Sequence, residues 1–538
     1  MTTETGPEKT PEAAPRAGFA RRLIQTTSVV SGMTLLSRIL GLIRDAVFAR
    51  YFSTSLVMDA FLVANRIPNM LRRFFAEGAF SQGFVPVMAR YREKHSHDEA
   101  REFVDAVAGT FGLILFVVTL VGVIAAPVLV AIVAPGFIGD DGRFEIATLM
   151  LRFTFPYLFF VSLTAFAGGI LNTYGRFGVP AFTPVILNIV LIAGAVWVSP
   201  LLDEPGMALA YAVFVAGLLQ LLFQLPFLMR IRALPRPKWG AAHEGVKRVG
   251  KLMLPAIFGS SVAQINVLIG GIIASMLGVG KISLLYYSDR LMEFPLGLFG
   301  IAIATVTLPY LSRQYANESM DEFSATLDWS MKLVLLIAVP AAIGLIILAG
   351  PLVATIFYGG AFTDEDVRMT ALAVQAFSVG LIGFSFVKIL APAYFAREDT
   401  RTPVRIGLIA LAVNFVLSVA LAWYLTSINF ASSHAGLALA ISVAALLNAY
   451  LLYRGLRREG VVRHSSGWRK LLIQVFISNG VMLGIIDWLT HPVAWWLDVD
   501  IFTRIIWLTV CVAGGAIVYF LVLLSLGMRP SDFAMRHR

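Results

Sequence analysis

The chain has 538 residues, of which 58% are hydrophobic and 14% are charged, whereas a soluble domain is about half apolar and a quarter charged. The mean hydropathy of +0.78 exceeds that of soluble proteins of this size, and one soluble core cannot hold the excess because such cores stop growing beyond roughly 250–300 residues. The composition therefore excludes a soluble enzyme, a nucleic-acid-binding module and a disordered scaffold. The net charge is +10, which in a membrane protein is concentrated in cytoplasmic loops. The single cysteine, Cys511, excludes an intrachain disulfide framework and a cysteine-based metal site.

Apolar runs of about 20 residues predict an all-α polytopic membrane protein with 14 transmembrane helices. The runs are too long for a β-barrel and lack its period-2 alternation. Residues 1–25 are mostly polar and are expected to form a disordered cytoplasmic tail. The predicted spans are 26–51, 56–89, 103–134, 146–173, 180–199, 206–229, 252–277, 282–311, 328–357, 368–395, 403–426, 435–453, 470–490 and 502–527. The first, second and eighth spans carry charges and are weak by hydropathy alone.

The charges of the loops predict the orientation of the chain in the membrane. The segments 230–251 and 454–469 are strongly basic, and acidic residues lie in loops of the opposite parity. Because loops rich in Lys and Arg stay in the cytoplasm, both termini, including the tail 528–538, are expected to be cytoplasmic. The segment 313–327 is an acidic exception, but acids carry little weight in this rule.

Two short matches indicate an internal repeat. Val85-Pro86-Val87 in the second span and Leu308-Pro309-Tyr310 in the eighth lie 223 residues apart, and Thr-Pro-Val at 183–185 and at 402–404 lies 219 residues apart. We therefore expect two six-helix lobes, 26–229 and 252–453, related by a pseudo-two-fold axis along the membrane normal. Transporters built from repeats bind their substrate between the halves. Helices 13 and 14, within 470–527, lie outside the repeat.

Charged residues gather in three of the predicted spans, although each costs roughly 2.5–3.5 kcal/mol at the centre of a bilayer on insertion scales. Arg38 and Asp45 are seven residues apart and share a helical face, as do Asp59, Arg66 and Arg73. Such faces indicate a water-filled cavity between the lobes. The charges in the first, second, eighth and tenth spans are Arg38, Arg44, Asp45, Asp59, Arg66, Arg72, Arg73, Glu77, Asp289, Arg290, Glu293 and Lys388.

The arginines are the more informative part of this set. Arginine stays charged when buried, and its planar fork matches phosphate oxygens, so such a cavity suits a phosphate or pyrophosphate. The alternative is ion pairing within the bundle, as between Arg73 and Glu77 or between Arg290 and Glu293. The first two spans hold more arginines than acids, but the eighth holds two acids and one arginine. Glycines and prolines in these spans, such as Pro68 and Pro295, either permit gating or are ordinary kinks.

No motif indicates catalysis or a bound metal. Gly278-Val279-Gly280-Lys281 resembles part of a phosphate loop but lacks its upstream glycine and its following Ser or Thr. His95 and His97 lie in a charged loop without partners at ligand spacing. We therefore expect no enzyme, no catalytic residues, no metal site and no cofactor.

The charged spans closely resemble the MurJ (MviN) family, the lipid II flippases of bacterial cell-wall synthesis, which belong to the multidrug/oligosaccharidyl-lipid/polysaccharide (MOP) exporter superfamily. The resemblance rests on Ser37–Asp45, on Asp59-Ala60-Phe61, on the long run Arg66–Gln82 and on Tyr286–Pro295. It extends over essentially the whole chain. The run Arg66–Gln82 is specific, because general multidrug exporters of the superfamily do not carry it.

The resemblance implies two six-helix lobes plus two helices that form a groove for an isoprenoid tail. It implies that lipid II, undecaprenyl-pyrophosphate bearing a disaccharide-pentapeptide, is moved from the cytoplasmic to the periplasmic leaflet of the inner membrane by alternating access. The substrate-binding residues that it implies are Arg38, Arg44, Arg72, Arg290 and Asp59. The supporting or gating charges are Asp45, Arg66, Arg73, Glu77, Asp289, Glu293 and Lys388.

The family also implies coupling to the membrane potential or to a cation. We place no sodium site, since Asn414 alone in the eleventh span is more typical of a helix-packing hydrogen bond. Expected partners are lipid II, membrane lipids and cell-wall synthesis proteins at the cytoplasmic loops, without nucleic acid.

Three other functions stay open. A related flippase for another polyprenyl-linked oligosaccharide is the nearest, and complementation of a lipid II flippase depletion separates it. A cation-coupled drug exporter favours acids or aromatic residues in its cavity instead of arginines. A non-transporting cell-wall scaffold has no need of charges within its spans.

Overall fold

A computed structural model describes residues 16–77, 79–94, 96–139, 142–297, 301–465 and 467–529. Within this set, the side chains of 16–27, 76, 77, 79, 97, 256–263 and 301–306 are left undescribed. The described chain consists of helices joined by turns and loops, and it carries no strand beyond one isolated bridge between Gly359 and Phe362. The predicted all-α class is therefore confirmed for these residues.

The first half of the bundle follows the predicted spans closely. Its elements are α1 (Arg16–Phe52), α2 (Leu56–Arg72), η1 (Arg73–Glu77), α3 (Ala79–Lys94), α4 (His97–Ile124), α5 (Ala126–Val133), η2 (Pro135–Phe137), α6 (Arg143–Thr154), α7 (Tyr157–Thr173), α8 (Gly178–Ala193), η3 (Gly194–Val198), η4 (Ser199–Leu201) and α9 (Met207–Arg230). The structure differs from the expected N-terminal tail in one part: α1 begins at Arg16, so 16–25 continues the first helix, while 1–15 and 530–538 of the two predicted tails lie outside the described residues. The polar composition of 16–25 does not prevent helix formation, because it contains no proline after Pro15.

The second half continues in the same manner and ends in a separate pair of long helices. Its elements are α10 (Glu244–Ser275), α11 (Lys281–Pro295), α12 (Ile301–Ala316), α13 (Met320–Ile347), α14 (Ala349–Ile356), α15 (Asp364–Phe395), α16 (Arg401–Ser427), α17 (His434–Arg458), α18 (Trp468–Leu489), α19 (Val493–Asp498) and α20 (Ile501–Ser525). The short α19 was not predicted. The basic segment 230–251 is partly helical, since α10 begins within it after the cap His243.

Ten helices in the described chain are long and apolar enough to cross a membrane. The chain is therefore a multi-span membrane protein. Helices α2, α3, α11 and α12 are each shorter than the 18 residues that this requires, and α1 carries several charges. In α10, the described apolar part is Gln264–Ser275.

The two halves repeat the same irregularities at an offset of 223 residues. Helix α4 gives way to α5 at Ala125, and α13 gives way to α14 at Leu348. The π-helical turn η1 begins at Arg73, and a second π-helical turn begins at Leu296. The packing also repeats, because α7 and α8 contact α9 as α15 and α16 contact α17. These coincidences support the predicted duplication.

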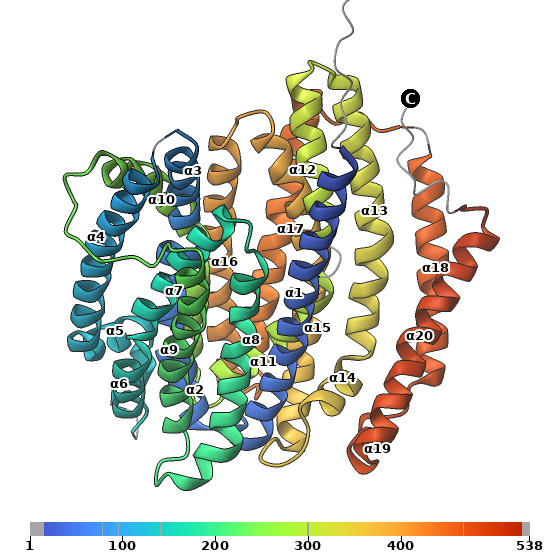
Figure 1. The fold of residues 1–538 in the computed structure, drawn as a ribbon. Coiled ribbons are helices and arrows are strands. Elements are labelled where there is room, and N and C mark those ends of the chain that lie inside the picture. The colour runs from blue at the N-terminus through green and yellow to red at the C-terminus, as the bar shows by residue number, and fades with distance from the viewer. Residues whose placement is uncertain are drawn as a thin grey trace, which may run out of the picture.

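Helices α18 and α20 pack on each other at the edge of the bundle (Figure 1). They are fastened to the second half at both ends. Near one end, the Trp468 indole N–H donates to Asp328 of α13 over 2.6 Å. Farther along, the Tyr519 hydroxyl donates to the Leu336 carbonyl over 2.9 Å, and Arg504 donates to the Ala354 carbonyl.

The turn between α1 and α2 joins the first half to the second at the end of the bundle opposite the N-terminus of α1 and the C-terminus of α20 (Figure 1). Asp366, in the first turn of α15, accepts hydrogen bonds from the Ser53 hydroxyl at 3.0 Å and the Thr54 hydroxyl at 2.6 Å. The same carboxylate accepts from Thr363 in a capping box. The backbone N–H of Ala361 donates to the Arg50 carbonyl over 2.8 Å.

Replacing Asp366 with Ala should lower the free energy of unfolding by about 1–3 kcal/mol, because a helix cap and buried hydrogen bonds to a charged group are lost together. Thermal and denaturant unfolding in detergent measures the change. Glu365→Ala, an exposed residue of the same turn, is the control and should leave stability nearly unchanged. Equal stability of the two variants would contradict this account.

Candidate functional site

A cavity of about 800 Å³ lies between the first half and α11 and α15 of the second half. Its charged lining comes from α1, α2, α11 and α15: Arg38, Arg44, Asp45, Arg72, Arg290, Glu293 and Lys388. A second cavity of about 370 Å³ shares Arg44, Arg72, Arg290 and Glu293 with it and adds Arg66 and Arg73. The described lining of the two cavities thus holds seven cationic side chains and two carboxylates, so it is strongly electropositive.

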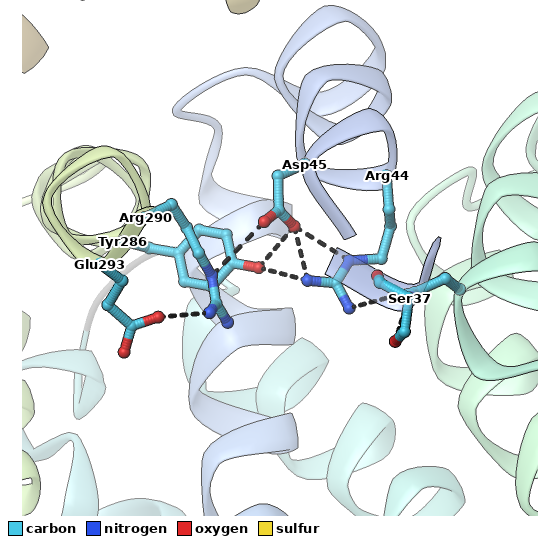
Figure 2. Close-up of polar contacts among 7 residues, drawn as sticks. Ser37, Arg44, Asp45, Tyr286, Arg290 and Glu293 are labelled. Atoms are coloured by element: carbon cyan, nitrogen blue, oxygen red, sulfur yellow. Dashed lines mark hydrogen bonds and ion pairs between the residues drawn. The ribbon is translucent and has the colours of Figure 1, made fainter. Parts of the chain in front are cut away.

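Asp45 lines the larger cavity and joins α1 to α11 (Figure 2). Its Oδ1 accepts from Arg44 Nε at 2.9 Å, from Arg44 Nη2 at 2.7 Å and from the Tyr286 hydroxyl at 2.7 Å. Its Oδ2 lies 3.4 Å from Arg290 Nε. One buried carboxylate therefore forms hydrogen bonds with the Arg44 guanidinium of its own helix and an ion pair with the Arg290 guanidinium of α11.

The arginines of this cluster have further partners. Arg44 Nη1 donates to Asn188 Oδ1 of α8 at 3.0 Å, and the Asn188 amide in turn donates to the Ser37 carbonyl. Arg290 lies over the Tyr286 ring at 5.0 Å and donates to Glu293 at 2.9 Å. The Arg290 side chain is 38% exposed and that of Arg44 is 14% exposed, so Arg290 is the more accessible to a ligand.

Three further arginines come from α2 and from the start of the π-helical turn η1 that follows it: Arg66, Arg72 and Arg73. Arg72 Nε donates to Asn69 Oδ1 at 3.2 Å, and Arg73 Nη1 donates to Gln264 Oε1 at 3.3 Å. The predicted Glu77 lies in η1, and its side chain is outside the described set. Arg66 faces the smaller cavity with its Nη1 buried and without a hydrogen-bond partner among the described residues.

Two glycines make room for two of these arginines. A Cβ atom at Gly297, in the π-helical turn after α11, would overlap the Arg38 guanidinium. A Cβ atom at Gly271 of α10 would overlap Arg66 Nη1. The neighbouring Gly270 has open space around its would-be Cβ atom. Gly271 and Gly297 therefore allow arginines of the first half to reach the backbone of the second half.

The structure places Asp59 outside both cavities. Asp59 is fully buried and accepts from Gly280 N at 2.6 Å, Ser283 N at 2.9 Å and Ser283 Oγ at 2.6 Å. A carboxylate at a helix N-terminus satisfies N–H groups that have no partner within the helix. The geometry assigns Asp59 to capping α11 and gives no support to a substrate contact.

The other predicted charges divide between the cavity and its surroundings. Lys388 of α15 lines the larger cavity and interacts electrostatically with Glu293 and Arg38. Asp289 lines neither cavity but interacts electrostatically with Arg66 and Arg73. The described residues contain no cluster of His, Cys, Asp and Glu that would suit a metal ion.

Known proteins resemble this chain over nearly its full length. The family model "Lipid II flippase MurJ" matches residues 48–507. A probable lipid II flippase MurJ of Vibrio cholerae serotype O1 is 44% identical and covers 95% of this chain and 98% of its own length. The chain belongs to the MurJ lipid II flippase family. The lipid II flippase MurJ of Burkholderia cenocepacia is 42% identical, with 96% of this chain and 99% of the relative covered.

Solved structures agree with the MurJ assignment. A lipid II flippase MurJ in an inward closed conformation superposes with a TM-score of 0.75 at 27% identity, over 92% of this chain and 97% of that one. An inward-facing multidrug transporter of the MATE family in the MOP superfamily gives a TM-score of 0.58 at 14% identity, over 80% of this chain and 94% of its own. The second match shows a shared fold alone.

Several residues of the site were not predicted from the charge pattern. Tyr286 and Asn188 position Arg44, and Gln220 and Gln224 of α9 line the larger cavity. All four are uncharged, so a search for charges within spans passes over them. A search for Asn, Gln and Tyr inside apolar runs would have found them.

Gly271→Ala should weaken binding of a pyrophosphate lipid by about tenfold, the order of one weakened charge-assisted hydrogen bond, because the new methyl group displaces Arg66. Thermal stability should change little, since the end of a flexible side chain can move. The control is Gly270→Ala, which meets no neighbouring atom and should bind normally. Binding of undecaprenyl-pyrophosphate to purified protein measures the effect, and equal affinities of the two variants would refute the role of Gly271.

Proposed function

We propose that this protein carries lipid II from the cytoplasmic to the periplasmic leaflet by alternating access. Its electropositive cavity would bind the pyrophosphate of the headgroup. The observation that carries the proposal is the gathering of Arg38, Arg72 and Arg290 around the 800 Å³ cavity. Membership of the MurJ lipid II flippase family supports the same substrate.

The physical problem is the passage of a charged headgroup across roughly 30 Å of hydrocarbon. Arginine suits this task because it stays charged and offers paired donors to phosphate oxygens. Arg44 is largely engaged by Asp45, whereas Arg290 and Arg38 are more exposed to the cavity. Binding of the anion would neutralise cations on both halves, so it would favour closure of the cavity around the headgroup.

We propose the predicted topology of fourteen spans, with two six-helix lobes and both termini in the cytoplasm. The repeated helix breaks and repeated packing of the two halves support the lobes. In this arrangement α18 and α20 lie outside the lobes, where a groove for the isoprenoid tail would let the tail remain in lipid. The basic segments 230–251 and 454–469 would face the cytoplasm, where cell-wall synthesis proteins are encountered.

We further propose that the contacts around the α1–α2 turn form the periplasmic gate. Asp366 holds Ser53 and Thr54, and Asp59 holds the N-terminus of α11. These hydrogen bonds join the two halves at one end of the bundle, so they must break or move before the cavity opens there. Asp59 would therefore act on transport through the gate, without touching the substrate.

The positive charge of the cavity also suggests how the membrane potential could supply energy for transport. One elementary charge moved across 100 mV is worth roughly 2.3 kcal/mol. We propose that the membrane potential biases the return of the unloaded cationic cavity.

Arg38→Ala and Arg290→Ala should each abolish growth of a bacterial strain that relies on this protein alone, because the pyrophosphate loses a charge-assisted contact. Both variants should still reach the membrane at normal levels. The control is Arg152→Ala, an exposed arginine of α6 that lines neither cavity, and it should support normal growth. Normal growth with either cavity variant would overturn the proposal.

Cysteines at positions 50 and 361 should form a disulfide that locks the proposed gate, because Ala361 N donates to the Arg50 carbonyl over 2.8 Å. The pair is introduced by Arg50→Cys and Ala361→Cys into a Cys511→Ser background. Oxidation should stop transport of lipid II in vesicles, and a reductant should restore it. Full transport by the oxidised, cross-linked protein would show that this contact need not open.

A further inference from the structure

One wall of the larger cavity is polar but uncharged. Helices α7, α8 and α9 lie beside one another (Figure 1) and supply this wall. Their polar lining consists of Tyr157, Thr164, Asn172, Thr183, Asn188, Gln220 and Gln224. No Asp, Glu, Lys or Arg of these three helices lines the cavity among the described residues. The cavity therefore has a charged side and a neutral hydrogen-bonding side.

Gln220 and Gln224 are deeply buried residues of the neutral side. They are four residues apart on α9, so they lie on one helical face. Their exposed fractions are 3% and 1%. Gln220 Nε2 donates to the Thr183 carbonyl at 2.8 Å. The Oε1 atoms of both glutamines are buried and have no hydrogen-bond partner among the described residues.

Two neighbouring amide oxygens without hydrogen-bond donors are costly in a protein interior, because each has lost its hydrogen bonds to water and gained none in return. Gly168, Gly169, Pro180 and Pro184 line the same wall. None of these four side chains can donate a hydrogen bond, and the hydroxyls of Thr164 and Thr183 and the amide of Asn188 on this wall donate to backbone carbonyls instead. Each glutamine has several rotatable bonds, so a modest rotation presents its oxygen to the cavity that it lines.

We propose that the α7–α9 wall is the subsite for the sugar-peptide head of the transported lipid. Gln220 and Gln224 accept hydrogen bonds from its amide N–H or hydroxyl groups. The proposal rests on the function proposed above and adds specificity to it. The arginines bind the pyrophosphate, which every polyprenyl-pyrophosphate lipid carries, and the glutamines distinguish lipids that carry the sugar and peptide.

The test compares the affinities of purified protein for lipid II and for undecaprenyl-pyrophosphate, which lacks sugar and peptide. Gln220→Met and Gln224→Met keep the size of the side chain and remove the amide. Each should weaken lipid II binding by about 3- to 10-fold, as expected for one lost hydrogen bond, and leave undecaprenyl-pyrophosphate binding unchanged. The matched control is Gln474→Met on α18, a buried glutamine that lines neither cavity.

Further binding measurements separate the possible outcomes. A lipid that bears only the monosaccharide and pentapeptide tells whether the lost contact lies on the first sugar and peptide or on the second sugar. A parallel loss of affinity for lipid II and undecaprenyl-pyrophosphate, or no loss for either, overturns the subsite. If the unaltered protein binds neither lipid, the proposed function fails; if it binds both and the glutamine variants match Gln474→Met, only the subsite fails.

Discussion

The constraint on which the site depends is the presence of several permanent cations inside a membrane bundle. Asp45 meets part of this constraint by holding Arg44, Tyr286 and, at 3.4 Å, Arg290. The cluster lowers the net charge at its centre, and its hydrogen bonds position the Arg44 guanidinium. Further cations lie around this cluster and form no ion pair among the described residues: Arg38, Arg66 and Lys388. An anionic ligand can neutralise their charge.

The arrangement of helices lets some of these cations reach across the junction between the two halves. Glycine at 271 and at 297 lets Arg66 and Arg38 cross from the first half to the backbone of the second. The π-helical turns at Arg73 and Leu296 occur at equivalent places of the repeat. Such turns are often found at functional sites because they displace the helix face locally. Here they lie beside the cavity in both halves.

The fold could be predicted from the sequence because apolar runs and their breaks are strong signals. The charged spans also predicted a cavity, because charged side chains are costly to place in lipid. Asp59 shows where this reasoning fails. Its spacing from Arg66 and Arg73 gives the correct helical face, but each seven residues also advance about 10 Å along the axis. At the depth of Asp59, that face meets the N-terminus of α11 instead of the cavity.

The most direct test of the central claim is the exposure of lipid II on the outer leaflet in cells depleted of this protein. An externally added enzyme that cleaves lipid II reports the exposed fraction, and extraction reports the total. The account predicts that the exposed fraction falls to background while total lipid II rises. An unchanged exposed fraction, in cells that make no other flippase for this lipid, would contradict it.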